Sequence, residues 1–198
     1  MSYTLQEIKL NPSLLTYKIS WQKHDLTLRP LISKDNTALT LFLESLSTET
    51  RENYVLNDYG KGTADEFCES IAKYDKLRLV LLQNDQIIGL FEYSMDIPST
   101  DKERLQKYGF IYDEKTICRF GPCVSDDFQG KGLVTTVFPS LCDIALKMGM
   151  NKMLLWGGVF TENTKAVKYY LRMGFIELGN FVNQDRKSSK DMLLELQK

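Results

Sequence analysis

A short glycine-rich stretch, DDFQGKGLVTT at residues 126–136, has the residue types of an anion-binding turn. Gly130 and Gly132 flank Lys131, and an apolar segment with helical spacing follows. Glycines let backbone N–H groups approach an anion closely, and the start of a helix offers unpaired N–H groups with a partial positive charge. Lys131 adds a cation, so a phosphate or pyrophosphate is the expected ligand. The alternative is a tight turn with a purely structural role.

The stretch matches neither of two widespread nucleotide-binding signatures. It lacks the GxxxxGK[ST] pattern of a Walker loop, and Thr135 stands where the third glycine of GxGxxG belongs. The turn alone therefore does not identify the ligand.

A second motif, ENTKAVKYYLRMGF at residues 162–175, combines a small helical face with a phenol. Ala166 and Tyr170 are four residues apart and share one face of the expected helix, with Asn163 on nearly the same side. Gly174 is a fitting end for that helix. Taken alone, the motif reads equally well as a core-facing stripe of alanine and tyrosine closed by a glycine.

Together, and in this order, the two motifs resemble those of the GNAT superfamily of N-acetyltransferases. The first signature of that family is Q/R-x-x-G-x-G/A after a strand, and residues 129–134 read QGKGLV. The second signature, N-x-x-A-x-x-x-Y-x-x-x-G-F, fits from Asn163 onward. Val134 departs from the usual Gly or Ala, and Pro139 is unusual in the following helix. The resemblance covers residues 24–196.

The resemblance implies that acetyl-CoA binds between two parallel strands that splay apart, here residues 116–124 and 152–159. Cys123 and Val124 would hydrogen-bond the pantetheine arm through their main chain, and an N–H near Val124 would polarise the thioester carbonyl. Asn163 would contact the cofactor arm. The pyrophosphate would lie on the N–H groups of Gln129, Gly130, Lys131, Gly132, Leu133 and Val134.

The implied reaction is direct attack of an amine on the thioester, with Tyr170 as the general acid that protonates the departing thiolate. A phenol with a pKa near 10 is protonated at neutral pH and can serve. Glu92 is a candidate for the base that deprotonates the substrate, or else an exposed strand residue. Cys123 and Cys142 could carry an acyl group in principle, but no histidine lies near them in sequence to activate them.

Periodicity and turn signals predict a mixed α/β fold of the GNAT-like kind, with a mostly antiparallel twisted sheet, a splayed central parallel strand pair and flanking helices. Asn84 and Asp85 between two apolar runs indicate a hairpin. Gly121–Pro122 should interrupt strand pairing, because proline lacks the N–H. The expected helices cover residues 33–46, 63–74, 132–148 and 163–173, and a shorter helix is expected from residue 100. The expected strands cover residues 24–31, 116–124, 152–159, 175–181 and 191–197, and residues 77–95 are expected to form a two-stranded hairpin.

The chain is expected to form one acetyltransferase domain over residues 24–198, with residues 1–23 as an N-terminal extension packed on it. The polar segment 47–62 reads as a loop, and the segments 47–62 and 97–115, which are longer than simple connections require, are candidates for setting acceptor specificity.

Bulk properties narrow the class of protein. The 198 residues carry a formal net charge of −1, without the basic surplus of nucleic-acid-binding proteins. The four cysteines contain no CxxC pair and His24 is the single histidine, so no metal is expected. The sequence reads as cytoplasmic, with no signal peptide and no membrane-spanning run. The expected partner is an amine of a small molecule or peptide. A homodimer is implied by family analogy alone. The alternative function is an acyl-CoA-binding module without turnover.

Overall fold

The computed structural model describes residues 2–183 and 186–197. The chain forms two compact units. The larger unit contains residues 3–93 and 121–144, and the smaller unit contains residues 94–120 and 145–198. Strand β5 (Ile117–Val124) and helix α6 (Leu133–Lys147) each run from one unit into the other. The expected fold class is confirmed: the sheet is mixed and mostly antiparallel, it contains one parallel pair among the described strands, and helices flank it.

Five strands of the larger unit follow the order β1-β2-β3-β4-β5. Antiparallel registers join β1 to β2 and β2 to β3. Asn84 and Asp85 turn the chain between β3 and β4 with φ values of 48° and 66°, the left-handed pair that a type I′ hairpin turn requires. The hairpin expected from the sequence is therefore confirmed. The four strands that precede β5 are β1 (Tyr17–Trp21), β2 (His24–Pro30), β3 (Lys76–Gln83) and β4 (Gln86–Ser94).

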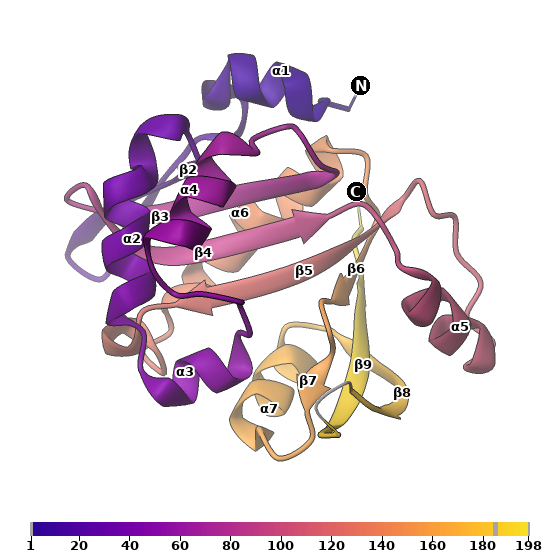
Figure 1. Cartoon of the computed structure of the whole chain (residues 1–198). Helices are drawn as coiled ribbons and strands as arrows, with labels where there is room; N and C mark the ends of the chain where they lie inside the picture. Colours follow the sequence, from indigo (N-terminus) through magenta and orange to yellow (C-terminus); the bar gives the residue numbers. More distant parts are fainter. Residues whose placement is uncertain (1, 184–185, 198) are drawn as a thin grey trace. The chain divides into compact units, whose positions relative to one another are not determined.

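Helices α2 (Asn36–Ser45) and α4 (Lys61–Glu69) cover one face of these strands (Figure 1). Leu39 of α2, Phe67 of α4 and Leu90 of β4 belong to one buried cluster. Helix α6 lies behind the same strands in Figure 1, and the hydroxyl of Tyr93 in β4 donates to the carbonyl of Leu141 in α6 over 2.8 Å. The sheet is therefore covered on both faces.

Residues before β2 also fold as part of the larger unit. Helix α1 (Leu5–Leu10) begins at Thr4, which forms a capping box with Glu7. A 3-10 turn (Pro12–Leu15) follows and leads into β1 at the edge of the sheet.

The polar segment 47–62 differs from the expected loop, because residues Thr48–Asn53 form helix α3. The hydroxyl of Ser47 accepts a hydrogen bond from the N–H of Thr50, which caps the helix. Thr50 is its one buried residue, so α3 has no apolar stripe that periodicity could reveal.

The smaller unit holds the parallel pair. Residues Ile117–Phe120 of β5 pair in parallel with β6 (Lys152–Leu155). This register runs up to Phe120, immediately before Gly121–Pro122, as the missing proline N–H predicts. Strand β9 (Ser188–Glu195) then pairs antiparallel with β6, with β7 (Val159–Phe160) and with β8 (Ile176–Val182).

The expected single strand over residues 152–159 is wrong. Gly157 and Gly158 both have φ of 71° and turn the chain between β6 and β7. A Cβ on Gly158 would lie 2.7 Å from the carbonyl oxygen of Lys190 and 2.8 Å from the ring of Phe181. Only glycine fits this close approach, which separates the two strands.

Two helices complete the smaller unit. Helix α5 (Ser99–Lys107) carries Arg104, whose guanidinium pairs with the buried Asp191 of β9 at 2.9 Å. Helix α7 (Thr164–Arg172) lies next to β7 (Figure 1) and carries the second sequence motif.

Candidate functional site

The glycine turn, defined as residues 129–132, links a 3-10 turn (Asp126–Phe128) to α6. Gly130 and Gly132 have φ values of 70° and 78°. No heavy atom lies within 4 Å of a Cβ built on either residue, apart from chain neighbours. The backbone therefore requires glycine at both positions, and the space beside them is open.

The first turn of α6 supplies N–H donors beside this space. The N–H of Thr136 bonds to the carbonyl of Gly132 at 3.1 Å, so the preceding helical residues lack an acceptor one turn back. Leu133 is buried and anchors the turn, Val134 is half-buried, and Lys131 is exposed. Free N–H groups, the positive end of the helix dipole and a lysine together suit an anion.

Gln129 is already engaged by the protein. Its main-chain N–H donates to the carbonyl of Asp126 at 3.2 Å. Its side-chain Nε2 donates to Thr50 Oγ1 and to the carbonyl of Val124, both at 2.9 Å. Within the described part of the chain, the N–H groups that remain for an anion therefore begin at Gly130.

Cys123 and Val124 lie at the end of β5 with their side chains buried. Burial raises the pKa of the Cys123 thiol, and the carboxylates of Asp126 and Glu92 add to the rise. A thiol held protonated is a poor nucleophile, so acyl transfer through Cys123 is disfavoured. The main chain of both residues is what they can offer a ligand.

Tyr170 lies in α7 between two aromatic rings. Its ring meets those of Phe175 and Tyr169 edge-on, with centroids 5.2 Å and 5.4 Å away. Burial raises the pKa of Tyr170, and the neighbouring phenol adds to the rise. The phenol therefore keeps its proton at neutral pH and can donate it.

Asn163 has a defined role in the fold. Its Oδ1 accepts a hydrogen bond from the N–H of Ala166 at 3.1 Å and caps the start of α7. Asn163 and Tyr170 belong to the smaller unit, and the glycine turn belongs to the larger one.

Glu92 is buried, which corrects the expectation of an exposed strand residue. Its Oε1 pairs with Arg78 Nε at 2.7 Å, and its Oε2 accepts from the hydroxyl of Tyr54. The guanidinium of Arg78 lies over the ring of Phe67, 3.5 Å from its centroid. Burial and the Glu92 charge raise the pKa of Tyr54. Glu92 is therefore committed to two partners.

Sequence reasoning missed a second set of polar contacts, between Asp126 and helix α3. The carboxylate of Asp126 accepts from the hydroxyls of Ser47 and Thr50. These partners lie more than 70 residues away in sequence, so no local pattern could have indicated them.

Over residues 2–183 and 186–197, no three His, Cys, Asp or Glu side chains are grouped so that they could hold a metal ion. In the same ranges no helix has both the length and the apolar character needed to cross a membrane.

Comparison with solved structures gives the fold context. The GNAT domain of the S. lividans protein PAT superposes with a TM-score of 0.68 at 16% identity, covering 93% of this chain and 99% of that one. Spermidine N-acetyltransferase from Vibrio cholerae, in complex with CoA and spermine, gives 0.63 at 21% identity, with 86% and 95% covered. RimL, a ribosomal alpha-N-protein acetyltransferase, gives 0.66 at 11% identity, with 91% and 94% covered.

Sequence comparison identifies the family. No curated protein sequence matches the chain significantly. The family model described as Acetyltransferase (GNAT) family matches residues 41–175, which include the glycine turn and the whole of the second motif. This match extends over more than half of the 198 residues, and the fold agrees with it. The chain therefore belongs to the acetyltransferase (GNAT) family.

Proposed function

We propose that this protein is an N-acetyltransferase that moves the acetyl group of acetyl-CoA onto a primary amine of a small molecule or peptide. The observation that carries the proposal is the open glycine turn at the start of α6, in a chain of this family. Two structural neighbours, a spermidine N-acetyltransferase and an alpha-N-protein acetyltransferase, support an amine acceptor.

In the proposed complex the pyrophosphate of the cofactor lies on the N–H groups of residues 130–134, beside Lys131. The pantetheine arm runs along the main chain of Cys123 and Val124. The N–H of Val124 is the donor assigned to the thioester carbonyl, while the carbonyl of Val124 accepts from Gln129 Nε2. Asn163 is proposed as a further contact of the cofactor arm.

The proposed chemistry is one displacement. The amine nitrogen attacks the thioester carbonyl, the C–S bond breaks, and the departing thiolate takes a proton from the hydroxyl of Tyr170. A typical alkylamine is neutral in only about one part in 10³ at pH 7, so the amine must first lose a proton. We do not propose Glu92 as this base, because its carboxylate is already bound by Arg78 and Tyr54. We propose that residues 24–198 form the catalytic domain and residues 1–23 an extension of it.

The direct test is a calorimetric titration with acetyl-CoA followed by a screen of primary amines for release of free CoA thiol. We expect saturable binding and thiol release with at least one amine class. Binding without release across the panel would favour an acyl-CoA-binding module without turnover, and the half-buried Val134 at the anion site is the feature that favours it. Absence of binding would overturn the proposed function.

A further inference from the structure

Four side chains join helix α3 to the glycine turn, and neither family motif accounts for their contacts. We call Ser47, Thr50, Asp126 and Gln129 the Asp126 cluster. Thr50 Oγ1 donates to Asp126 Oδ1 at 2.7 Å and accepts from Gln129 Nε2 at 2.9 Å. Ser47 contributes its hydroxyl to Asp126 Oδ1 and its N–H to Asp126 Oδ2, the latter at 2.9 Å. All four residues belong to the larger unit.

The hydrogen bonds of the cluster are all directed toward the carboxylate of Asp126. Gln129 donates to Thr50, Thr50 donates to Asp126, and Ser47 donates to the same carboxylate. Burial works to raise the pKa of Asp126, but the hydrogen bonds from Ser47 and Thr50 outweigh it and leave that pKa lowered. The carboxylate is therefore ionised at neutral pH, and the bonds to it are charge-assisted.

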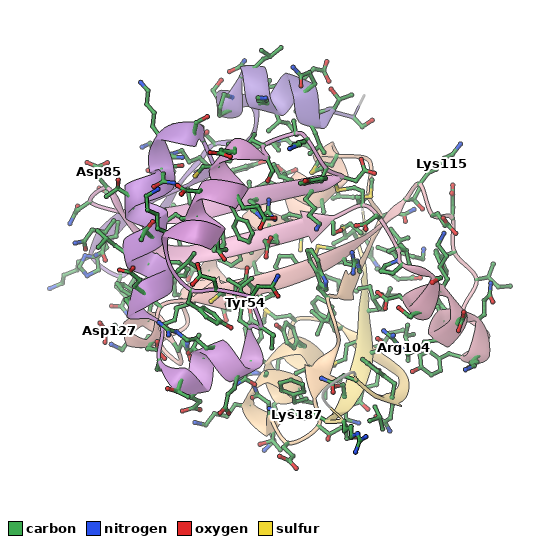
Figure 2. The ribbon with its side chains drawn as sticks, in the orientation of Figure 1. Tyr54, Asp85, Arg104, Lys115, Asp127 and Lys187 are labelled. Carbon is green, nitrogen blue, oxygen red and sulfur yellow. The ribbon has the colours of Figure 1, made fainter. Side chains whose placement is uncertain are left out.

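Helix α3 depends on these contacts. A six-residue helix is marginal on its own, because few backbone bonds offset the ordering of its residues. Its one buried residue is Thr50, which lies inside the cluster. At its other end Tyr54 donates to Glu92 of β4 (Figure 2). The helix is thus tied at its start to the glycine turn and at its end to the sheet.

Gln129 places the cluster next to the proposed anion site. The residue that follows it is Gly130, the first with an N–H available for a phosphate. The two N–H groups of its side-chain amide are divided between Val124 at the end of β5 and Thr50 on α3. The side chain of Gln129 therefore links the glycine turn directly to Thr50.

We propose that Asp126 and Thr50 are positioning residues that couple occupation of the glycine turn by CoA to the ordering of helix α3 and Tyr54. This inference rests on the proposed function, because it takes CoA as the ligand of the turn. The segment that becomes ordered, residues 47–54, begins the stretch that the sequence marks for acceptor specificity. Cofactor binding would then prepare the acceptor side of the enzyme before the amine arrives.

Amide hydrogen exchange with and without saturating CoA tests the coupling, with binding measured separately by calorimetry. In the unmodified protein we expect CoA to slow exchange in residues 130–136 and, by about tenfold or more, in residues 48–54. In Thr50→Val we expect CoA to protect residues 130–136 as before, while its effect on residues 48–54 is lost. Thr50→Ser keeps the hydroxyl and should restore that effect.

Asp126→Asn and Asp127→Asn form a second matched pair, which keeps the proposal testable if Thr50→Val folds poorly. Asp127 is exposed at the outer edge of the 3-10 turn (Figure 2) and lies outside the cluster. We expect Asp126→Asn to weaken the response of residues 48–54 to CoA and Asp127→Asn to leave it unchanged.

The possible results distinguish a failure of the coupling from a failure of the proposed function. If CoA binds and protects residues 130–136 but leaves residues 48–54 unaffected, the coupling is wrong and the proposed function stands. Equal protection of residues 48–54 in Thr50→Val and Thr50→Ser would also overturn the coupling. If CoA does not bind, the proposed function fails and the inference fails with it.

Discussion

At the residue scale, Tyr170 has the environment that a proton donor needs. Its ring packs edge-on against those of Tyr169 and Phe175, and the desolvation of its phenol raises its pKa. The raised pKa favours the protonated form at neutral pH, which a general acid requires. The same shift makes the phenol a weaker acid, so the proton transfer proposed for Tyr170 relies on the basicity of the thiolate that leaves as the C–S bond breaks.

Replacing Tyr170 by Phe tests this role. We expect kcat to fall by about 10²–10⁴, the usual contribution of a general acid, while the Kd for acetyl-CoA stays near its original value. Tyr169→Phe removes the adjacent phenol and serves as the control, with kcat nearly unchanged. Equal kcat values for Tyr170→Phe and the unmodified enzyme would remove Tyr170 from the mechanism.

The pH dependence of the rate follows from the same pKa. Activity should rise with pH as the substrate amine loses its proton. Loss of the Tyr170 proton would lower the rate at high pH, and a pKa raised above the ordinary value of 10.0 moves that loss to pH values above 10. We therefore expect kcat to show no alkaline decline between about pH 7 and 10. A decline inside this range that disappears in Tyr170→Phe would contradict the assigned pKa shift.

Two glycines with similar backbone angles should respond differently to alanine. Gly132 faces open space, whereas a Cβ on Gly158 would clash with the carbonyl of Lys190. Both changes cost about 1–2 kcal/mol of left-handed strain. Gly132→Ala should in addition raise the Kd for acetyl-CoA about tenfold, because its Cβ would enter the space beside the turn and hold the anion away from the N–H groups, and one charge-assisted hydrogen bond is worth roughly 1.5–3 kcal/mol. Gly158→Ala should lose more stability, measured by urea unfolding.

At the element scale, the start of α7 depends on one side chain. Asn163 caps the helix through Ala166, and the expected contact of Asn163 with the cofactor arm remains a prediction. The side-chain amide of Asn163 therefore stabilises the start of α7, whether or not it also contacts the ligand.

Asn163→Ala should lower the free energy of unfolding by about 1 kcal/mol, the usual loss for removing an N-cap. Asn163→Asp keeps the capping oxygen and should recover most of that stability in the same thermal or urea unfolding measurement. If the two variants are equally destabilised, the loss does not come from the cap.

The buried pair of Arg78 and Glu92 shows how two strands and a loop are joined. Arg78 lies in β3, Glu92 in β4, and Tyr54 follows α3. A buried charge is tolerated when it is paired and hydrogen-bonded, and both oxygens of Glu92 have partners. The hydrogen bond to Glu92 holds Tyr54 beside the sheet. Because both oxygens of Glu92 are occupied, neither is free to accept a proton from a substrate amine.

At the scale of the whole molecule, the near-neutral charge places anion binding on local groups. The formal net charge is −1, so no general field attracts a nucleotide. The glycine turn, the start of α6 and Lys131 must supply the attraction at short range. Affinity for CoA should therefore depend on these groups rather than on the overall surface.

Cofactor binding should be visible as stabilisation of the whole fold. At a concentration of acetyl-CoA 100 times its Kd, linkage adds about 2.7 kcal/mol, which corresponds to a rise in Tm of about 5–10 °C for a chain of this size. Differential scanning fluorimetry measures the shift, and Gly132→Ala should need about tenfold more ligand to reach it. A Tm that does not change at saturating acetyl-CoA would contradict the proposed ligand.

Local sequence patterns predicted those elements whose causes are local. Asn84 and Asp85 supply the left-handed angles of their own turn, and apolar periodicity marks the helices that pack on the sheet. The motif around Gly130 and Gly132 likewise predicts an open turn, because glycine is what the backbone there needs. The family resemblance, confirmed over residues 41–175, follows from the same two motifs.

Other features were decided by contacts between distant segments. Helix α3 is polar and short, and the residues at its start donate hydrogen bonds to Asp126 in a turn far along the chain. The sequence alone leaves Glu92 as a candidate base or an exposed strand residue, whereas in the structure it is buried and bound by Arg78 and Tyr54. The break between β6 and β7 comes from the close approach of β8 and β9 to Gly158. A sequence specifies what each segment can do by itself, whereas burial and partner choice follow from which segments the fold brings together.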